Sequence, residues 1–397
     1  MKKKIIFIHF NKFLDNFDWI RYEFDKLEQQ YDIEIHELLR INHPSFKNQD
    51  RNEGAQIKKF SDLKEWKQYL NNKKFENTVF IFQTFPYSIK SLKCYLLVKK
   101  KKIKCAIISI NNLPTYNNQK VKIFFLKKIY YKLLSIIFRP KQAIFVLESI
   151  IIRKIINFFR KQLSPDFVLL GGDNNSSKTM IKKLKDYSQI IRINSWDYSN
   201  SLRPNKEIEL KQKYALYVSD GEARYPSDSY LANSKRVEDP KKLCKKLCEF
   251  FEKFEKFYDL KIIIASHPRA TVENNLDIEL GKRLCFKGYT KELVKNSELI
   301  INAGSTSISY ATIYKKPVLY IFSNSQSRKN IPGMRKVEFI SRLINSERIN
   351  IDNFEDFKIL KLTVNNESYS EFFSRYVCIR RNKKNFEIIS EELMKKI

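Results

Sequence analysis

Three short polar clusters follow predicted strands in the second half of the chain, and their residue types suit acid–base chemistry and phosphate binding. They are Ser219-Asp220-Gly221-Glu222, Ser266-His267-Pro268-Arg269 and Asn302-Ala303-Gly304-Ser305-Thr306-Ser307. Because the carboxyl ends of parallel strands meet at one edge of a sheet, we expect the three clusters to face one site. The sequence therefore predicts a single ligand site in this half of the chain.

The third cluster predicts a phosphate site. Gly304 precedes three hydroxyl residues, Ser305, Thr306 and Ser307, and a helix is predicted from Ser307 to Tyr314. Free backbone N–H groups and the positive end of a helix dipole would favour an anion there. The simpler alternative is that these hydroxyls only cap the helix.

Two basic side chains are expected on the opposite wall of the same site. His267 and Arg269 follow the preceding strand and would add donors for a phosphate. The alternative for His267 is a core histidine with structural hydrogen bonds. A phosphate flanked by such donors indicates a nucleotide as the ligand.

Asp220 is the carboxylate of the first cluster that stands directly before glycine. Its simplest interpretation is a turn residue, because Asp-Gly is a common turn dipeptide.

Two further polar stretches follow predicted strands in the first half of the chain. They contain Gly172-Asp173-Asn174 and Trp196-Asp197. Exposed tryptophan and aspartate are typical of sugar-binding sites, so we expect both stretches to line the side of the site that faces an acceptor. Ordinary loop chemistry is the alternative for each.

These clusters depend on strands that alternate with helical segments through both halves of the chain, the pattern of a parallel sheet with helices on both faces. The predicted strands are Lys4–His9, Tyr31–His36, Thr78–Gln83, Lys104–Ser109, Phe167–Leu170, Ile190–Ile193, Tyr214–Val218, Leu260–Ala265, Leu299–Asn302 and Val318–Phe322. A chain of 397 residues is long for one core. The sequence thus predicts the α/β class, with two Rossmann-like domains that face a cleft.

We place the domain boundary in a polar stretch between the two alternating blocks. Residues 1–203 would form the first domain, and residues 204–380 the second, which would hold most of the nucleotide. Residues 381–397 would form a terminal helix that packs back on the first domain.

The formal charge of +31 implies an anionic partner, which could be nucleic acid, an acidic membrane face or an acidic substrate. Residues 120–161 carry eleven Lys and Arg against one acid, with aromatic residues between them, which is typical of helices that lie on a bilayer surface. Ordinary surface helices are the alternative, and no nucleic-acid-binding motif accompanies the charge. The residues expected to contact the membrane are Lys122, Phe124, Phe125, Lys127, Lys128, Tyr131, Lys132, Phe138 and Arg139.

Compartment signals favour a cytoplasmic protein on the inner face of the membrane. The apolar run after Met1 is too short for a signal peptide, and no run is long enough to span a bilayer. The six cysteines have no zinc or redox spacing, so we expect free thiols.

The order and positions of the three clusters resemble the motifs of bacterial sialyltransferases and polysialyltransferases of the GT-B class. Those families carry an acidic pair before glycine, then His-Pro, then a Ser/Thr pair. The resemblance covers residues 219–325, with Ser219 at the first acidic position and Asp220 as the matching carboxylate.

The resemblance implies a glycosyltransferase of surface glycan biosynthesis, for capsule, lipooligosaccharide or O-antigen. Asp220 would deprotonate the acceptor hydroxyl, while His267 and the three hydroxyl residues would stabilise the leaving phosphate without a metal or cofactor. The donor would be a CMP-linked acidic sugar such as sialic acid. The acceptor would be lipid-linked or a lipooligosaccharide. Residues 1–203 would then form an acceptor- and membrane-facing domain, and residues 204–380 a nucleotide-sugar-binding domain.

Three alternatives stay open. A UDP- or GDP-sugar-dependent transferase has the same two-domain build, and so does a sugar-nucleotide epimerase, which would need no acceptor. The third is a basic protein that binds membrane surfaces and performs no catalysis, in which His267 and Asp220 carry no chemistry.

Overall fold

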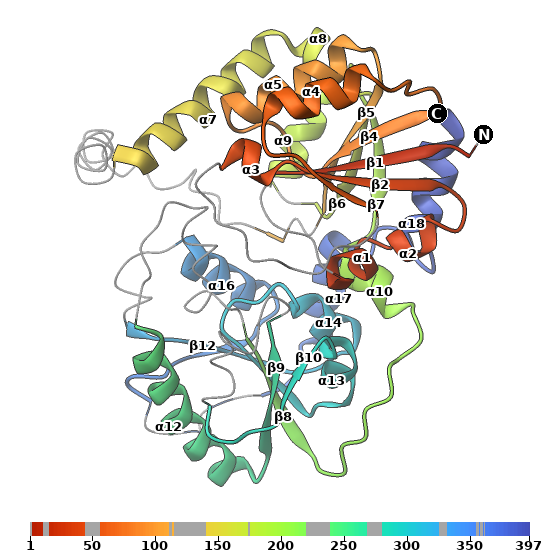
Figure 1. Ribbon diagram of the computed structural model, residues 1–397. Helices are drawn as coiled ribbons and strands as arrows, with labels where there is room; N and C mark the ends of the chain where they lie inside the picture. Colours follow the sequence, from red (N-terminus) through yellow and green to blue (C-terminus); the bar gives the residue numbers. More distant parts are fainter. Residues whose placement is uncertain are drawn as a thin grey trace.

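The protein is described from a computed structural model, in which two parallel sheets form two lobes (Figure 1). The structure describes residues 2–10, 16–43, 56–110, 113–114, 140–173, 175–219, 239–267, 280–324, 332–354, 357, 360 and 362–397. Asp220, Arg269, Asn174 and all nine residues expected to contact a membrane lie outside these ranges.

The first sheet has seven strands in the order β3-β2-β1-β4-β5-β6-β7, and every pair is parallel. Its strands are β1 (Lys4–His9), β2 (Asp32–Glu37), β3 (Ile57–Lys59), β4 (Thr78–Phe82), β5 (Lys104–Ser109), β6 (Phe167–Gly171) and β7 (Gln189–Ile193). Strands such as β4 are buried throughout because helices cover both faces of the sheet.

The second sheet has six parallel strands in the order β10-β9-β8-β11-β12-β13. They are β8 (Tyr214–Val218), β9 (Lys261–Ser266), β10 (Cys285–Lys287), β11 (Leu299–Asn302), β12 (Val318–Phe322) and β13 (Glu347–Asn350). In both sheets the chain first builds outward to one side and then reverses, which is the Rossmann strand order. The expected two-domain Rossmann-like architecture is therefore confirmed.

Side chains of alternate residues along each strand enter opposite cores. In β1, Ile6 and Ile8 face α4 and α5, while Ile5 and Phe7 face α2 and α10. The helices of the first domain are α1 (Asn16–Arg21), α2 (Phe24–Leu27), α3 (Leu39–Asn42), α4 (Leu63–Asn71), α5 (Ile89–Lys100), α7 (Pro140–Phe158), α8 (Arg160–Leu163), α9 (Asn175–Leu184) and α10 (Trp196–Ser201).

The second domain is covered in the same way, and its long helix α12 buries the aromatic residues Phe250, Phe251 and Phe254 against the sheet. Its helices are α12 (Pro240–Tyr258), α13 (Thr290–Asn296), α14 (Ile308–Ile313), α16 (Pro332–Leu343), α17 (Asn366–Phe372) and η3 (Phe373–Val377). No helix in the described part of the chain is both long and apolar enough to cross a membrane. All six cysteines are free.

After η3 the chain returns to the first domain. Helices α18 (Asn385–Ile388), η4 (Ile389–Leu393) and η5 (Met394–Lys396) follow, and Ile388, Leu393 and Met394 belong to the core under the first sheet. The Lys3 Nζ also donates to the Met394 carbonyl at 2.7 Å. The two domains are therefore connected twice, once after α10 and once before α18.

Candidate functional site

The carboxyl edge of the second sheet brings the predicted clusters together. Val218 pairs with Asn302 on one side and with Ala265 on the other, so the strands end side by side. The strand order reverses between β8 and β11, and open α/β sheets bind ligands at such a reversal. Ser219, half-buried His267 and the turn after β11 all follow these strands directly.

The turn after β11 is held by its own asparagine. Asn302 is fully buried, and its Oδ1 accepts hydrogen bonds from the Gly304 and Ser305 amides at 2.7 Å each. Its Nδ2 donates to the Ser305 carbonyl at 3.2 Å. Gly304 has a φ of 135°, which other residues rarely adopt, so glycine is required at this point.

These bonds correct the expectation that the turn offers free backbone amides. The Gly304 and Ser305 amides are taken by Asn302, and the Ser307 amide donates to the Ser305 Oγ at 3.3 Å. The helix that follows, α14, is also only six residues long. The turn therefore offers a ligand the half-buried hydroxyls of Ser305, Thr306 and Ser307 and, among these amides, only that of Thr306, which bonds no described residue.

Trp196 and Asp197 are buried, which corrects the expectation that they are exposed. The Trp196 ring packs edge-on against Tyr22 at 5.1 Å in the core of the first domain. Asp197 bonds the Ser309 side chain on α14, close to Arg21. Burial raises the pKa of the Asp197 carboxyl, and Arg21 and the Ser309 hydroxyl oppose that rise.

Asp197 thus connects α10 of the first domain to α14, immediately behind the hydroxyl turn. The two helices pack directly on each other between the lobes (Figure 1). The position of the turn in the second domain is therefore coupled to the end of the first sheet.

Asn194, at the end of β7, holds the returning chain. Its Nδ2 donates to the Arg380 and Lys383 carbonyls at 2.9 and 2.7 Å, and its Oδ1 accepts from the Ile379 and Arg380 amides at 2.8 and 2.7 Å. Its backbone amide donates to the Asn385 Oδ1 at 2.9 Å. Every polar atom of the Asn194 side chain is therefore used for structure.

Glu23 completes this junction between α2, α10 and α18. Its carboxylate accepts from the Ser199 hydroxyl at 2.7 Å and from the Phe386 amide at 2.8 Å. Burial raises the pKa of Glu23, while these two hydrogen bonds act against the rise. No local pattern marked Glu23, because its partners are far away in the sequence.

Gly172 and Asp173 lie at the carboxyl edge of the first sheet, after β6. The Asp173 carboxylate is 3.5 Å from the Lys178 Nζ and 3.8 Å from an Arg192 guanidinium nitrogen. Its charge also acts on Arg375 of η3, in the second domain. Asp173 is therefore partly exposed at the side of the first domain that faces the second.

The sequence analysis missed two polar residues at the reversal point of the first sheet. Gln83 and Thr84 follow β4, and their Oε1 and Oγ1 atoms are buried without a hydrogen-bond partner in the described structure. The backbone amide of Gln83 donates a hydrogen bond to the Ile8 carbonyl at 3.2 Å, so Gln83 lies directly beside β1. Unsatisfied buried acceptors and hydroxyls are unusual and indicate a place for a ligand or water.

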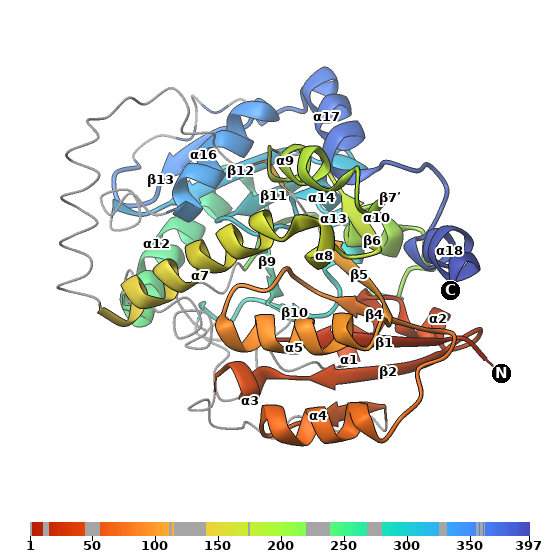
Figure 2. The ribbon, with the colours of Figure 1, turned by 90° about the horizontal axis from the view of Figure 1, so that it is seen from above.

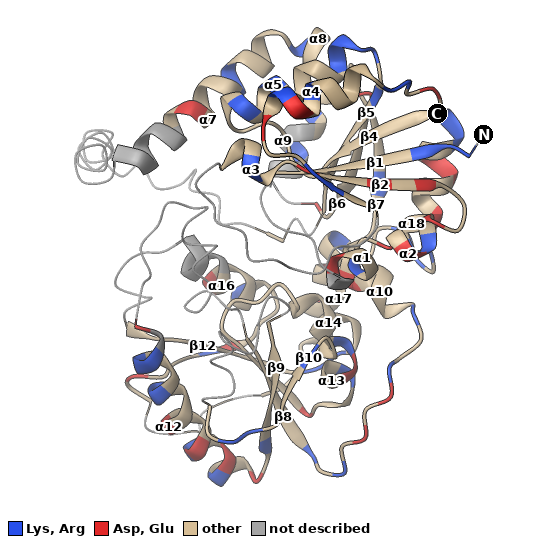
Figure 3. Cartoon of the chain, in the orientation of Figure 1, with Lys and Arg blue, Asp and Glu red and all other residues tan. Residues whose placement is uncertain are grey.

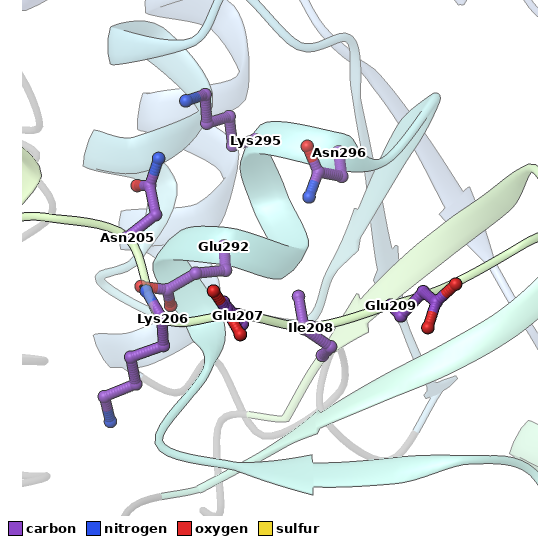
Figure 4. Close-up of a pocket in the computed structure, with 8 residues that line it drawn as sticks. All are labelled: Asn205, Lys206, Glu207, Ile208, Glu209, Glu292, Lys295 and Asn296. Atoms are coloured by element: carbon purple, nitrogen blue, oxygen red, sulfur yellow. The ribbon is translucent and has the colours of Figure 1, made fainter.

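An open pocket of ≈ 390 Å³ lies apart from all these residues (Figure 4). It runs between α13 and the linker that follows α10, where Glu292 accepts from the Lys206 amide at 3.0 Å. It is lined by Asn205, Lys206, Glu207, Ile208, Glu209, Glu292, Lys295 and Asn296. None of them belongs to a predicted cluster, and we assign the pocket no role in the site.

The described residues contain no group of three or more His, Cys, Asp or Glu side chains that could hold a metal ion. No family model matches the sequence. No curated protein matches it either.

Solved structures do resemble this chain. The wall teichoic acid polymerase TagF matches with a TM-score of 0.52 and 14% identity, over 100% of this chain and 89% of that one. A TagF variant soaked with CDPG matches at 0.50 and 14%, over 100% and 90% of the chains. A UDP-GlcNAc 2-epimerase from Methanocaldococcus jannaschii matches at 0.45 and 15%, over 96% and 95%. The likeness to TagF shows the fold, which is the GT-B arrangement of two Rossmann-like domains.

Proposed function

We propose that the protein is a glycosyltransferase that uses a nucleotide-linked sugar as donor and binds the nucleotide at the carboxyl edge of the second sheet. One observation carries the proposal: in a GT-B fold, Ser219, His267 and the 302–307 turn converge at the reversal point of that sheet. TagF, which has the same fold, is a wall teichoic acid polymerase.

The donor side of the proposed site uses hydroxyls and cations. The leaving phosphate would accept hydrogen bonds from the hydroxyls of Ser305, Thr306 and Ser307. His267, which follows β9, would donate to the same phosphate. Arg269, just beyond β9 in the sequence, would add charge, so that the developing negative charge is stabilised without a metal. Asp220, next to Ser219, would remove the proton from the attacking hydroxyl.

The acceptor side would be the carboxyl edge of the first sheet. Asp173 and the unsatisfied Gln83 and Thr84 atoms offer hydrogen-bonding groups to a sugar there. Gly172 and Asn174 adjoin Asp173 in the sequence, and we include them on the acceptor side. Trp196 and Asp197 are buried, so we no longer assign them to the acceptor side.

For the donor we favour a cytidine nucleotide, and within that class a CMP-linked acidic sugar. The three motifs support CMP, and the TagF variant soaked with CDPG supports cytidine more broadly. The acceptor would be a membrane-associated glycan on the inner face of the membrane, in keeping with the charge of +31.

A thermal-shift screen against CMP, CDP, UDP, GDP and ADP tests the donor site. A ligand at about 100 times its Kd stabilises the native state by about 2.7 kcal/mol, which is a shift of several degrees in Tm. We expect the largest shift with a cytidine nucleotide, and its loss in His267→Ala. His43→Ala, also a half-buried histidine but in the first domain, is the matched control and should keep the shift.

The outcomes separate the alternatives. A shift with UDP or GDP alone would contradict the cytidine donor and favour another transferase or an epimerase. No shift with any nucleotide, in folded protein, would contradict a nucleotide-dependent enzyme. Asp220→Ala should keep the nucleotide shift and abolish transfer to an acceptor.

A further inference from the structure

Helix α7 packs against α5 on the first domain (Figure 2). Its inner face is fixed by two contacts. Glu148 accepts a hydrogen bond from the amide of Ile89, the first residue of α5, at 2.6 Å. Ile152, one turn later, is fully buried. The opposite face of α7 therefore points away from the domain.

The exposed surface of α7 carries apolar side chains beside its cations. Leu147, Ile151 and Phe158 are 50%, 55% and 82% exposed, and their spacing of four and seven residues places them on one stripe of the helix. Ile150 on α7 and Phe159 directly after it are further exposed apolar residues. A surface helix normally turns its polar face to water, so this stripe indicates a partner.

The charges beside the stripe select the partner. Arg153, Lys154 and Lys161 are exposed, whereas the only acid of α7 and α8, Glu148, is held against α5. Figure 3 shows this acid as the red segment of α7. The outer face thus combines apolar residues with positive charge alone, which matches the interface of an anionic bilayer. A second copy of the chain would bring the same positive charge and be repelled.

We infer that the outer face of α7 and α8, formed by Leu147, Ile150, Ile151, Phe158 and Phe159 with Arg153, Lys154 and Lys161, docks the protein on an anionic lipid surface. The apolar side chains insert between the acyl chains and the cations contact the headgroup phosphates.

The orientation connects this surface to the acceptor, a step that rests on the proposed function. A helix that joins two parallel strands runs antiparallel to them, so the amino end of α7 lies on the side of the carboxyl edge of the first sheet. Asp173, Gln83 and Thr84 lie at that edge. Leu147, the docking residue nearest the amino end of α7, is therefore also the one nearest the edge that is proposed to bind a lipid-borne acceptor.

Vesicle flotation tests the inference without any need for activity. Wild-type protein is incubated with vesicles of phosphatidylcholine and phosphatidylglycerol, or of phosphatidylcholine alone. We expect binding to the anionic vesicles only, and binding at least about tenfold weaker in the double variant Ile151→Ser with Phe158→Ser. Lys154→Glu should weaken binding most at low salt. Leu284→Ser, which removes a 50% exposed leucine from the second domain, is the matched control.

Each variant also goes through the nucleotide screen, so that failure of the docking surface and failure of the donor site are told apart. Equal binding of the double variant and the wild type would overturn the inference, as would wild-type protein that does not float with anionic vesicles. Light scattering that shows a dimer split by the double variant would also overturn it, because the stripe would then join two copies.

Discussion

Two strand ends of this molecule look alike in sequence and differ in role. β7 is followed by Asn194-Ser195, which lead into α10, while β11 ends at Asn302 and leads through a serine-rich turn into α14. Both asparagines are fully buried. Asn302 bonds only residues within its own turn, whereas the Asn194 side chain bonds residues that follow it by 185 or more positions.

The difference shows what decides whether a polar strand end can bind a ligand. After β7, residues 379–383 cover the carboxyl edge of the sheet and form hydrogen bonds with both polar atoms of the Asn194 side chain. At β11 nothing in the described chain bonds the Thr306 hydroxyl, and the neighbouring serine hydroxyls bond each other. Helix α10, which follows β7, packs on α14, which follows β11, through Asp197 and Ser309. The segment after β7 therefore supports the turn after β11.

The strongest test of the comparison is Asn194→Ala. The change leaves two carbonyls and two amides of the 379–383 segment without partners, and we expect the free energy of unfolding to fall by roughly 3–5 kcal/mol. Urea unfolding measures the loss. Asn200→Ala is the control, because that half-buried side chain on α10 bonds no described residue. Equal stability of the two variants would mean that Asn194 does not hold the junction.

Asn302→Ala should have a smaller effect on stability and a larger one on binding. Its bonds are local, so a loss of about 1–2 kcal/mol in unfolding free energy is expected. The turn would lose its shape, and nucleotide affinity should fall by at least about tenfold, measured by isothermal titration. Wild-type affinity in this variant would show that the turn does not contribute to the donor site.

The smallest expected effect is on pH dependence, and it concerns Glu23. Its pKa in the folded state is raised above the ordinary value of 4.5, mainly by burial. The folded state therefore holds a proton more readily than the unfolded state, and this contribution is full below pH 4.5 and lost as pH rises through the folded pKa.

Glu23→Gln removes that contribution. Wild-type stability relative to the variant should therefore increase as pH falls from about 7 towards 4.5, as measured by urea unfolding at several pH values. Asn302→Ala changes a turn without carboxylates and should leave the pH dependence unchanged. A difference between wild type and Glu23→Gln that does not vary with pH would contradict the raised pKa.

The buried strands could be predicted from the sequence because each is an apolar run that both faces of a sheet require. Predicted and observed bounds agree for β1, β5, β8, β11 and β12. The strands that were missed, β3, β10 and β13, are edge strands of three or four residues that contain lysine, arginine or glutamate. Such strands are partly exposed and carry no distinct apolar pattern.

The site could be predicted only as far as strand order allows. Parallel strands place Ser219, His267 and Ser305 at one edge whatever covers them. Whether a side chain at that edge stays accessible depends on segments distant in sequence. Such segments cover Trp196 and form hydrogen bonds with Asn194. The amides of Gly304 and Ser305 were wrongly expected to be free for a different reason, because the Asn302 side chain accepts hydrogen bonds from both within the same turn.

The second crossing between the domains also has a consequence for synthesis. The core under the first sheet includes Ile388, Leu393 and Met394, which are translated almost two hundred residues after β7. While the second domain is being synthesised, the apolar face of the first sheet that these residues later cover is still exposed. Its folding is therefore completed only after that of its neighbour, and during that interval a nascent chain of this protein is a natural client for a chaperone.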